Sequence, residues 1–328
     1  MSVRPCQCAL VSAPNVSALR LSECNGLSLV QRLPAGRLSV APPTVHLMVA
    51  ALSPSRAADF MQCPLLYRFR VIDKLPSLPS AAAARGTLVH SVLERLFDLP
   101  ASDRTIEAAT SLVEPQWRAL LEGEPELGDL VDEADPAAVA SWFGDAVSLI
   151  ERWFTLEDPT KLEPAERELY VETDLDGLTL RGYVDRLDLT PAGDMRIVDY
   201  KTGRSPSELF ERKALFQMKF YALVLWRLRG EVPRMLQLVY LANSEIVRYS
   251  PDEAELLAVE RKLKALWQAI ETAARTGDWR PSTSKLCDWC DHRDLCPAWG
   301  GTPPPLPEDA AVLALDPRAT ATASPAED

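Results

Sequence analysis

Apolar positions repeat with two different periods along this chain, and the change of period divides its central part into helices and strands. In four segments the apolar residues recur three or four positions apart, as on one face of a helix. The first segment begins with Ser53-Pro54, a helix N-cap followed by proline at the first helical position. The pattern predicts helices over residues 53–63, 86–97, 105–121 and 137–155.

Beyond residue 165 the pattern favours strands, because β-branched, aromatic and aliphatic residues gather between turn signals. Asp176-Gly177 and the run from Thr190 to Asp194 are the expected turns. This predicts a meander of antiparallel strands over residues 168–172, 178–189 and 195–200. We expect next a helix over 207–229, strands over 235–241 and 247–249, and a helix that begins at Ser250-Pro251.

The two ends of the chain lack these patterns. Residues 1–47 contain no lysine and no sustained apolar period, so we expect a poorly ordered extension. Met48 is an alternative start, in which case the extension is not native. Residues 301–328 are rich in proline, alanine and threonine and predict a disordered tail. The folded domain is then 48–300, with an acidic helical insertion at about 98–167.

Composition excludes a chain that is disordered throughout, since 47% of the 328 residues are hydrophobic and 25% are charged. No run approaches the roughly 18 uncharged apolar residues of a membrane span, and no signal-peptide pattern opens the chain. We therefore expect a soluble, cytoplasmic protein with no membrane partner. The net charge of -12 argues against nucleic acid, but residues 98–174 hold 20 acidic and 5 basic residues. The acidity belongs to one segment and excludes nothing.

Charged residues interrupt two of the predicted strands in a regular way. Gly182-Tyr-Val-Asp185 is followed, after one turn, by Asp199-Tyr200-Lys201. Because side chains alternate between the faces of a strand, Asp199 and Lys201 point the same way and Tyr200 points the other. If the two strands pair through the turn, Asp185 reaches the same cluster.

Two carboxylates beside an ammonium group suit Mg²⁺ or Mn²⁺, which prefer oxygen ligands and complete their shells with water and phosphate oxygens. Such a metal polarises a phosphoryl oxygen and lowers the pKa of a bound water. Lys201 is then available to neutralise the charge that develops on phosphorus. The chemistry indicated is phosphodiester hydrolysis, although an Asp-x-Lys element taken singly is more often a solvated surface pair.

The order of these residues resembles the PD-(D/E)XK nuclease superfamily, in its RecB-type exonuclease branch, which includes the nuclease domain of AddB. Asp199-Tyr200-Lys201 matches the acid-x-lysine element of the family. His90 resembles the branch's helical histidine, and Glu168 resembles an acidic residue that precedes the strands. Gln217 and Tyr221 resemble the glutamine and tyrosine of a helix beside the active site.

The resemblance covers most of residues 53–299 and implies an α/β fold with a restriction-endonuclease-like core, in which helices flank a central mixed sheet. It implies a metal-dependent DNA exonuclease that acts on single strands or duplex ends in repair or recombination. His90, Asp185 and Asp199 would hold Mg²⁺ or Mn²⁺, and Lys201 would stabilise the transition state. Gln217 and Tyr221 would position the metal ligands or the DNA strand.

Seven cysteines without a secretion signal indicate reduced thiols or metal ligands. Cys287, Cys290 and Cys296 need a fourth ligand to close a tetrahedral set, and Cys63 is the other cysteine of the expected domain. In the RecB-type branch this arrangement resembles the ligand set of a [4Fe-4S] cluster that joins the N- and C-terminal ends. A zinc site of four cysteines, or of three with His292, remains the alternative, because spacing does not separate iron from zinc.

Other functions and partners remain open at this point. The sequence has no Gly-x4-Gly-Lys-Ser/Thr loop, so any unwinding would come from a separate helicase. The alternatives are a CRISPR-adaptation-type nuclease, a non-catalytic iron-sulfur module that binds DNA ends or a partner, and a small-molecule metallohydrolase. The basic residues expected to follow phosphates are Arg68, Arg70, Lys74, Arg204, Lys213 and Lys219.

Overall fold

The computed structural model describes residues 51–77, 79–132, 134–205 and 208–315, without the side chains of 208–213. The expected extension 1–47, Met48 and the last thirteen residues, 316–328, lie outside this description. The helices are α1 (Pro54–Gln62), α2 (Pro64–Tyr67), α3 (Ala81–Leu96), α4 (Ile106–Gly123), α5 (Pro136–Leu156), α6 (Glu208–Arg229), α7 (Glu253–Thr276) and α8 (Ala310–Leu315). The strands are β1 (Ala51–Leu52), β2 (Glu166–Leu175), β3 (Leu178–Leu189), β4 (Met195–Lys201), β5 (Met235–Tyr240) and β6 (Glu245–Tyr249).

The strands form one mixed sheet, as the family resemblance implies. β2, β3 and β4 are successive antiparallel neighbours, β5 runs parallel to β4, and β6 runs antiparallel to β5. On the side of β3 away from β2, β1 pairs in parallel at Thr179 and Leu180. β4 pairs with the same side only from Arg186 to Leu189. Among the described residues, the middle of β3 therefore has no strand partner on this side.

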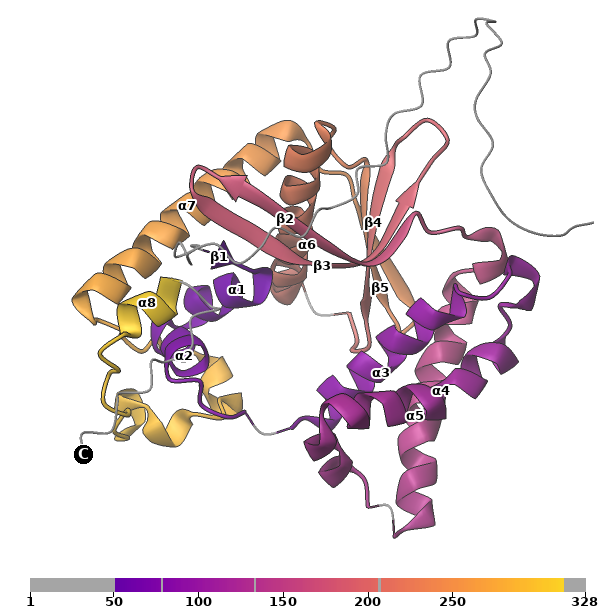
Figure 1. The fold of residues 1–328 in the computed structure, drawn as a ribbon, viewed down its shortest axis with the longest axis horizontal. Helices are drawn as coiled ribbons and strands as arrows, with labels where there is room; N and C mark the ends of the chain where they lie inside the picture. The colour runs from indigo at the N-terminus through magenta and orange to yellow at the C-terminus, as the bar shows by residue number, and fades with distance from the viewer. Residues whose placement is uncertain (1–50, 78, 133, 206–207, 316–328) are drawn as a thin grey trace, which may run out of the picture. The chain divides into compact units, whose positions relative to one another are not determined.

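Different helices cover the two faces of the sheet (Figure 1). Alternation along β4 directs Ile197 into the core beneath α6 and α7, and Val198 and Tyr200 into the core beneath α3, α4 and α5. Each fully buried aliphatic side chain in these cores contributes about 2 kcal/mol through removal of apolar surface from water. Helices thus pack against both faces of the sheet. No described helix is long and apolar enough to cross a membrane.

The acidic insertion is part of the core, which its composition does not reveal. Its helices α4 and α5 pack against α3 and against the sheet. Trp153 of α5 is fully buried, with its ring centroid 6.1 Å from that of Phe97 and 6.3 Å from that of Tyr200. The insertion therefore shares with α3 the covering of one face of β4 and β5.

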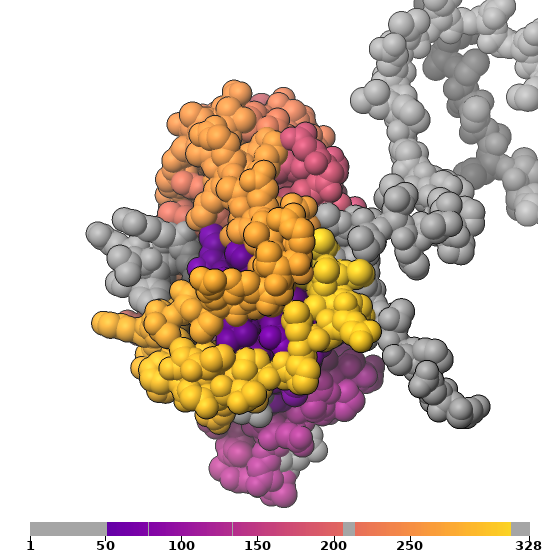
Figure 2. Space-filling model, turned by 90° about the vertical axis from the view of Figure 1, so that its left-hand side faces the viewer, coloured from indigo at the N-terminus to yellow at the C-terminus, as the bar shows by residue number. Residues whose placement is uncertain are grey.

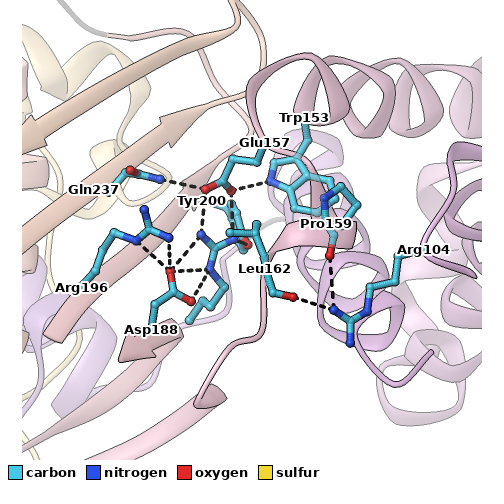
Figure 3. Close-up of polar contacts among 10 residues, drawn as sticks. Arg104, Trp153, Glu157, Pro159, Leu162, Asp188, Arg196, Tyr200 and Gln237 are labelled. Carbon is cyan, nitrogen blue, oxygen red and sulfur yellow. Dashed lines mark hydrogen bonds and ion pairs between the residues drawn. The ribbon is translucent and has the colours of Figure 1, made fainter. Parts of the chain in front are cut away.

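A buried polar network joins the insertion to the sheet (Figure 3). Arg186 of β3 lies 2.8 Å from Glu157, just after α5, and 3.1 Å from Asp188, and its side chain is 1% exposed. Its guanidinium also donates to the hydroxyl of Tyr200. Glu157 accepts further hydrogen bonds from the side chains of Trp153 and Gln237. The ring of Tyr200 is therefore held by packing against Trp153, and its hydroxyl is held by the buried guanidinium of Arg186.

The expectation of a disordered tail from residue 301 is wrong for residues 301–315. Helix α8 buries Ala310, Leu313 and Ala314 in the same core as α6 and α7. The carbonyl of Ala314 accepts hydrogen bonds from Arg56 and Tyr67. Figure 2 shows this C-terminal segment, in yellow, lying over the indigo N-terminal helices. The composition of the segment, rich in proline, alanine and threonine, gave no sign of a short apolar helix that packs against the core.

We expect Glu157→Ala to lower the free energy of unfolding by about 3 kcal/mol, because it leaves the buried charge of Arg186 undercompensated. Urea denaturation followed by circular dichroism measures this loss. The matched control is Glu114→Ala, which removes an exposed ion pair with Arg118 on α4 and should cost less than about 0.5 kcal/mol. Equal, small effects of the two substitutions would contradict an insertion anchored through this ion pair.

Candidate active site

The site is built where β3 and β4 stop pairing. Their ladder reaches only to Arg186 opposite Val198. One residue further along, the carboxylate of Asp185 accepts the backbone N–H of Tyr200 at 2.8 Å. A side chain thus replaces the backbone acceptor that a continuing ladder would supply, and it stands in the gap between the two strands.

Glu168 lies opposite Asp185 in the register of β2 and β3. The neighbouring residue pairs, Arg167 with Arg186 and Leu169 with Val184, are bridged, and the ladder is interrupted at Glu168. The backbone of Glu168 has a φ of 43°, in the left-handed region that residues other than glycine rarely adopt. This local strain brings a second carboxylate to the gap, and such strain is concentrated at functional sites.

His90 approaches the two carboxylates from α3. Its Nε2 lies 2.9 Å from the carbonyl of Tyr200, and its Nδ1 lies 3.4 Å from Asp185 Oδ2. Because a carbonyl only accepts, we infer that Nε2 carries the hydrogen and that Nδ1 keeps a free lone pair. One ligand atom each from His90, Glu168 and Asp185 lie within 4.8 Å of one another.

Burial and mutual repulsion raise the pKa values of the carboxylates in this group. Burial, followed by the nearby Asp199, raises the pKa of Asp185 to about 8. Burial and the carboxylate of Asp185 raise the pKa of Glu168 to about 7. Burial lowers the pKa of His90, so its ring is neutral at pH 7. Two carboxylates that hold on to protons and a neutral imidazole form a donor set that a divalent cation fits, because the cation would replace those protons.

Asp199 and Lys201 share one side of β4, as the alternation of the strand predicts. Lys201 Nζ lies 2.7 Å from Asp199 Oδ2. Gln217 of α6 joins both, because its amide nitrogen donates to Asp199 at 3.2 Å and its oxygen accepts from Lys201 at 3.1 Å. The predicted metal set of His90, Asp185 and Asp199 is therefore not the set that converges most closely. The third member of the converging group is Glu168, while Asp199 forms an ion pair with Lys201.

Tyr221, one turn beyond Gln217 on α6, packs directly onto Gly182 of β3. A Cβ atom at residue 182 would lie 2.7 Å from the Tyr221 ring, so the close approach of α6 to β3 requires glycine there. The hydroxyl of Tyr221 lies 3.5 Å from the amide nitrogen of Gln217. Tyr221 thus fixes the helix that carries Gln217 and is itself 6% exposed.

An open cleft of 760 Å³ leads to the site. Its walls come from the start of α1, the middle of β3, the segment after β4 and α6. A second hollow, of 370 Å³, is lined by Gly86, Glu94 and Glu168, and His90 borders both spaces. Lys201 and Arg204 line the larger cleft, and none of the described lining residues carries a carboxylate. The described lining of this cleft therefore has basic and no acidic side chains, in a chain whose net charge is -12, and Lys201 is paired with Asp199 from behind.

Of the basic residues expected to follow phosphates, Arg204 lines this cleft. Arg68 is buried and paired with Asp73, and Arg70 is paired with Asp59. Lys219 donates to the side chains of Tyr249 and Glu255. The side chain of Lys213 lies outside the described residues. Three of the six expected residues thus form internal ion pairs.

The four cysteines of the domain line one small cavity of 30 Å³ at the other end of α1. Cys63 accepts the backbone N–H of Ser282 at 3.3 Å, and Cys287 accepts that of Ser284 at 3.4 Å. Burial raises the pKa of the Cys290 thiol, and the three other cysteines raise it further. The expected contact between the first helix and the C-terminal trio is therefore present.

Sequence reasoning left Glu168 out of the predicted metal set, although a signal was available. The two-residue turn Asp176-Gly177 fixes the register of the β2–β3 hairpin, and counting back from it pairs residue 168 with residue 185. The role of Glu157 had no such signal, since its contact with Arg186 joins distant segments.

Comparison with known proteins finds two phage relatives and a similar solved structure. A protein of mycobacteriophage D29 named Gene 69 protein is 28% identical over 275 residues, which cover 75% of this chain and 96% of the relative. The Gene 69 protein of mycobacteriophage L5 is 24% identical with the same coverage. A solved structure from Eubacterium rectale, described as a predicted exonuclease, is 17% identical with a TM-score of 0.49, covering 74% of this chain and 88% of its own.

The family model described as PD-(D/E)XK nuclease superfamily matches residues 51–297, which contain the sheet, the group of His90, Glu168 and Asp185, and the Asp-x-Lys element. The central mixed sheet flanked by helices agrees with a restriction-endonuclease-like core. This chain belongs to the PD-(D/E)XK nuclease superfamily.

Proposed function

We propose that this protein is a metal-dependent DNA exonuclease of the RecB type, which hydrolyses single strands or duplex ends in DNA repair or recombination. The observation that carries the proposal is the convergence of His90, Glu168 and Asp185 within 4.8 Å beside a cleft lined by Lys201. A nuclease needs a cation site at the end of a surface that accepts an anionic chain, and the described residues offer both.

His90, Glu168 and Asp185 would hold Mg²⁺ or Mn²⁺, with Asp199 as a further carboxylate outside the 4.8 Å group. Two carboxylate ligands suit either ion, and the imidazole favours Mn²⁺ over Mg²⁺. The hydrogen bond from His90 to the Tyr200 carbonyl would orient the ring so that Nδ1 faces the ion. A bound cation would polarise a phosphoryl oxygen and activate a water.

The protein's own side chains would act on the charge of the phosphate. Lys201 is half-buried and held by Asp199 and Gln217, so its ammonium group is oriented before the substrate arrives. It would donate to the oxygen on which negative charge develops. Gln217 would position Lys201 and Asp199, which it contacts directly, and Tyr221 would position Gln217.

We also propose that Cys63, Cys287, Cys290 and Cys296 hold a structural [4Fe-4S] cluster. All four line one cavity, and three backbone N–H groups, from residues 282, 284 and 292, donate to their sulfurs. A single tetrahedral zinc ion would need sulfurs about 3.8 Å apart, given Zn–S bonds of about 2.3 Å. Iron and acid-labile sulfide content separates the two alternatives, because ligand spacing along the sequence does not.

The physiological partner in this proposal is a separate helicase. The sequence has no P-loop to couple ATP hydrolysis to unwinding, while an exonuclease in break processing needs single strands to be exposed. The CRISPR-adaptation and non-catalytic alternatives have no particular observation in their favour.

The first test is degradation of end-labelled linear DNA with Mg²⁺ or Mn²⁺, with circular single-stranded DNA spared because an exonuclease needs an end. We expect Lys201→Ala to lower kcat by about 100-fold or more, since it removes a preorganised donor to the developing charge. Asp185→Asn should remove activity to a similar extent, because it removes a metal ligand.

The matched control for this test is Lys161→Ala, which removes an 80% exposed lysine outside the cleft and should leave kcat unchanged. Undiminished activity of Lys201→Ala would exclude the site from the mechanism. Cleavage of circular and linear strands at equal rates would overturn the exonuclease mode while leaving the nuclease.

A second test uses pH. The folded metal-free protein keeps the protons of Asp185 and Glu168 up to about pH 8 and 7, whereas the unfolded chain loses them near 4. These groups therefore make the free energy of unfolding fall as pH rises from about 4 to 8. Mn²⁺ must displace the same protons, so the Mn²⁺-induced rise in Tm should be larger at pH 8 than at pH 6.

Differential scanning fluorimetry at the two pH values, with and without Mn²⁺, measures this difference. Asp185→Asn should lose most of the Mn²⁺-induced rise, while Glu114→Gln, far from the site on α4, should retain it. The assigned ligands would be contradicted by a Mn²⁺-induced rise in Tm that does not depend on pH, or by a rise of wild-type size in Asp185→Asn.

A third test concerns the cysteine cavity. Protein purified without oxygen should be brown and should contain about four iron and four acid-labile sulfide per chain. Cys290→Ser should lose the colour and lower the Tm, because the pairing of α1 with the C-terminal segment is weakened. A colourless wild-type protein with one zinc per chain would establish the zinc alternative instead.

A further inference from the structure

An exposed pair of aromatic rings stands beside the metal-binding group, which does not use it. Tyr183 is 58% exposed and Tyr170 is 46% exposed. The two residues lie opposite each other in β3 and β2, with ring centroids 5.2 Å apart. Tyr183 is two residues from Asp185, and Tyr170 is two from Glu168, a distance of about 7 Å along each strand.

Tyr183 faces the cleft and not the core. The residues on either side of it in β3 are turned inward, since Gly182 packs against Tyr221 and Val184 is buried in the core with α6. Tyr183 itself lines the 760 Å³ cleft. The hydroxyl of Tyr170 donates to Glu172, which holds the second ring behind the first. One exposed aromatic residue is ordinary, but here a ring that lines a cleft is backed by a second exposed ring, which is typical of binding surfaces.

The charge of the cleft selects the ligand that these rings would meet. Lys201 and Arg204 line it, and no described lining residue is acidic. A ligand that fits this surface has negative charges along a chain and flat rings free to stack. Single-stranded nucleic acid has both, whereas the bases of a duplex are already stacked on one another.

We propose that Tyr183, supported by Tyr170, is a platform on which a base of a single DNA strand stacks as the adjoining phosphate reaches the metal-binding group. This rests on the proposed nuclease function and deepens it, because it assigns the single-stranded form to the cleft and names the side chain that recognises it. Stacking on an aromatic ring does not depend on which base is present, so no sequence preference is expected.

The test is equilibrium binding of a fluorescent single-stranded oligonucleotide to the full chain without divalent cation, so that no cleavage occurs. Tyr183→Ala should weaken binding about tenfold or more, and Tyr170→Ala less, while Tyr183→Trp and Tyr183→Phe should stay within about twofold of wild type. The control is Leu228→Ala, which removes a 51% exposed side chain on α6 that does not line the cleft. Melting temperatures of all variants report on folding.

A second arm separates stacking from phosphate binding. Replacing bases near the end of the oligonucleotide by abasic residues keeps every phosphate, and it should weaken binding to the wild type but hardly affect Tyr183→Ala. Affinity for a blunt duplex should change less than about twofold in Tyr183→Ala. Wild-type affinity of Tyr183→Ala for single strands, or an abasic effect of the same size in both proteins, would overturn the platform.

The two proposals fail separately in this design. Binding is measured without metal, so a wild type that stacks single strands but cleaves no DNA with Mg²⁺ or Mn²⁺ would refute the nuclease function and keep the platform. Conversely, metal-dependent cleavage together with unaltered single-strand binding by Tyr183→Ala and Tyr170→Ala would refute the platform and keep the nuclease.

Discussion

The site depends on one hydrogen bond at the end of the β3–β4 ladder. The backbone N–H of Tyr200 donates to the carboxylate of Asp185 instead of to a backbone carbonyl of the neighbouring strand. This contact is possible because β3 and β4 separate one residue after Arg186. The separation leaves room for a carboxylate between the strands, and burial there raises its pKa. The strands thus create a place where an uncompensated negative charge is costly, and a bound cation would remove that cost.

Tyr200 links that gap to the rest of the molecule. Its N–H binds Asp185, its carbonyl accepts from His90, and its hydroxyl accepts from the buried Arg186. Arg186 is in turn neutralised by Glu157, which the acidic insertion supplies. The acidic insertion therefore holds the strand from which the site is organised. Its acidity and its structural role are separate properties, since the Glu157 carboxylate is buried and most of its other carboxylates are not.

Most of the helices and strands, and the pairing of Asp199 with Lys201, could be predicted from sequence, because periodicity and alternation are local properties. Glu168 could have been placed by counting residues from the Asp176-Gly177 turn, but its left-handed backbone could not, since tertiary contacts impose it. Helix α8 was missed for a related reason. Its few apolar residues form a helix because they pack against the core, and so short a helix is not stable alone. The proline-rich residues around it gave no sign of this helix in the sequence.

Helix α1 forms part of the wall of both cavities. Its N-cap, Ser53, lines the cleft, and Cys63, which follows its last residue, lines the cysteine cavity. A nine-residue helix is about 14 Å long and moves as a unit. Damage to the thiols by air or by alkylating reagents would therefore disturb the mouth of the cleft as well. Loss of DNA cleavage after such treatment would not, by itself, identify any cysteine as a group that takes part in the chemistry.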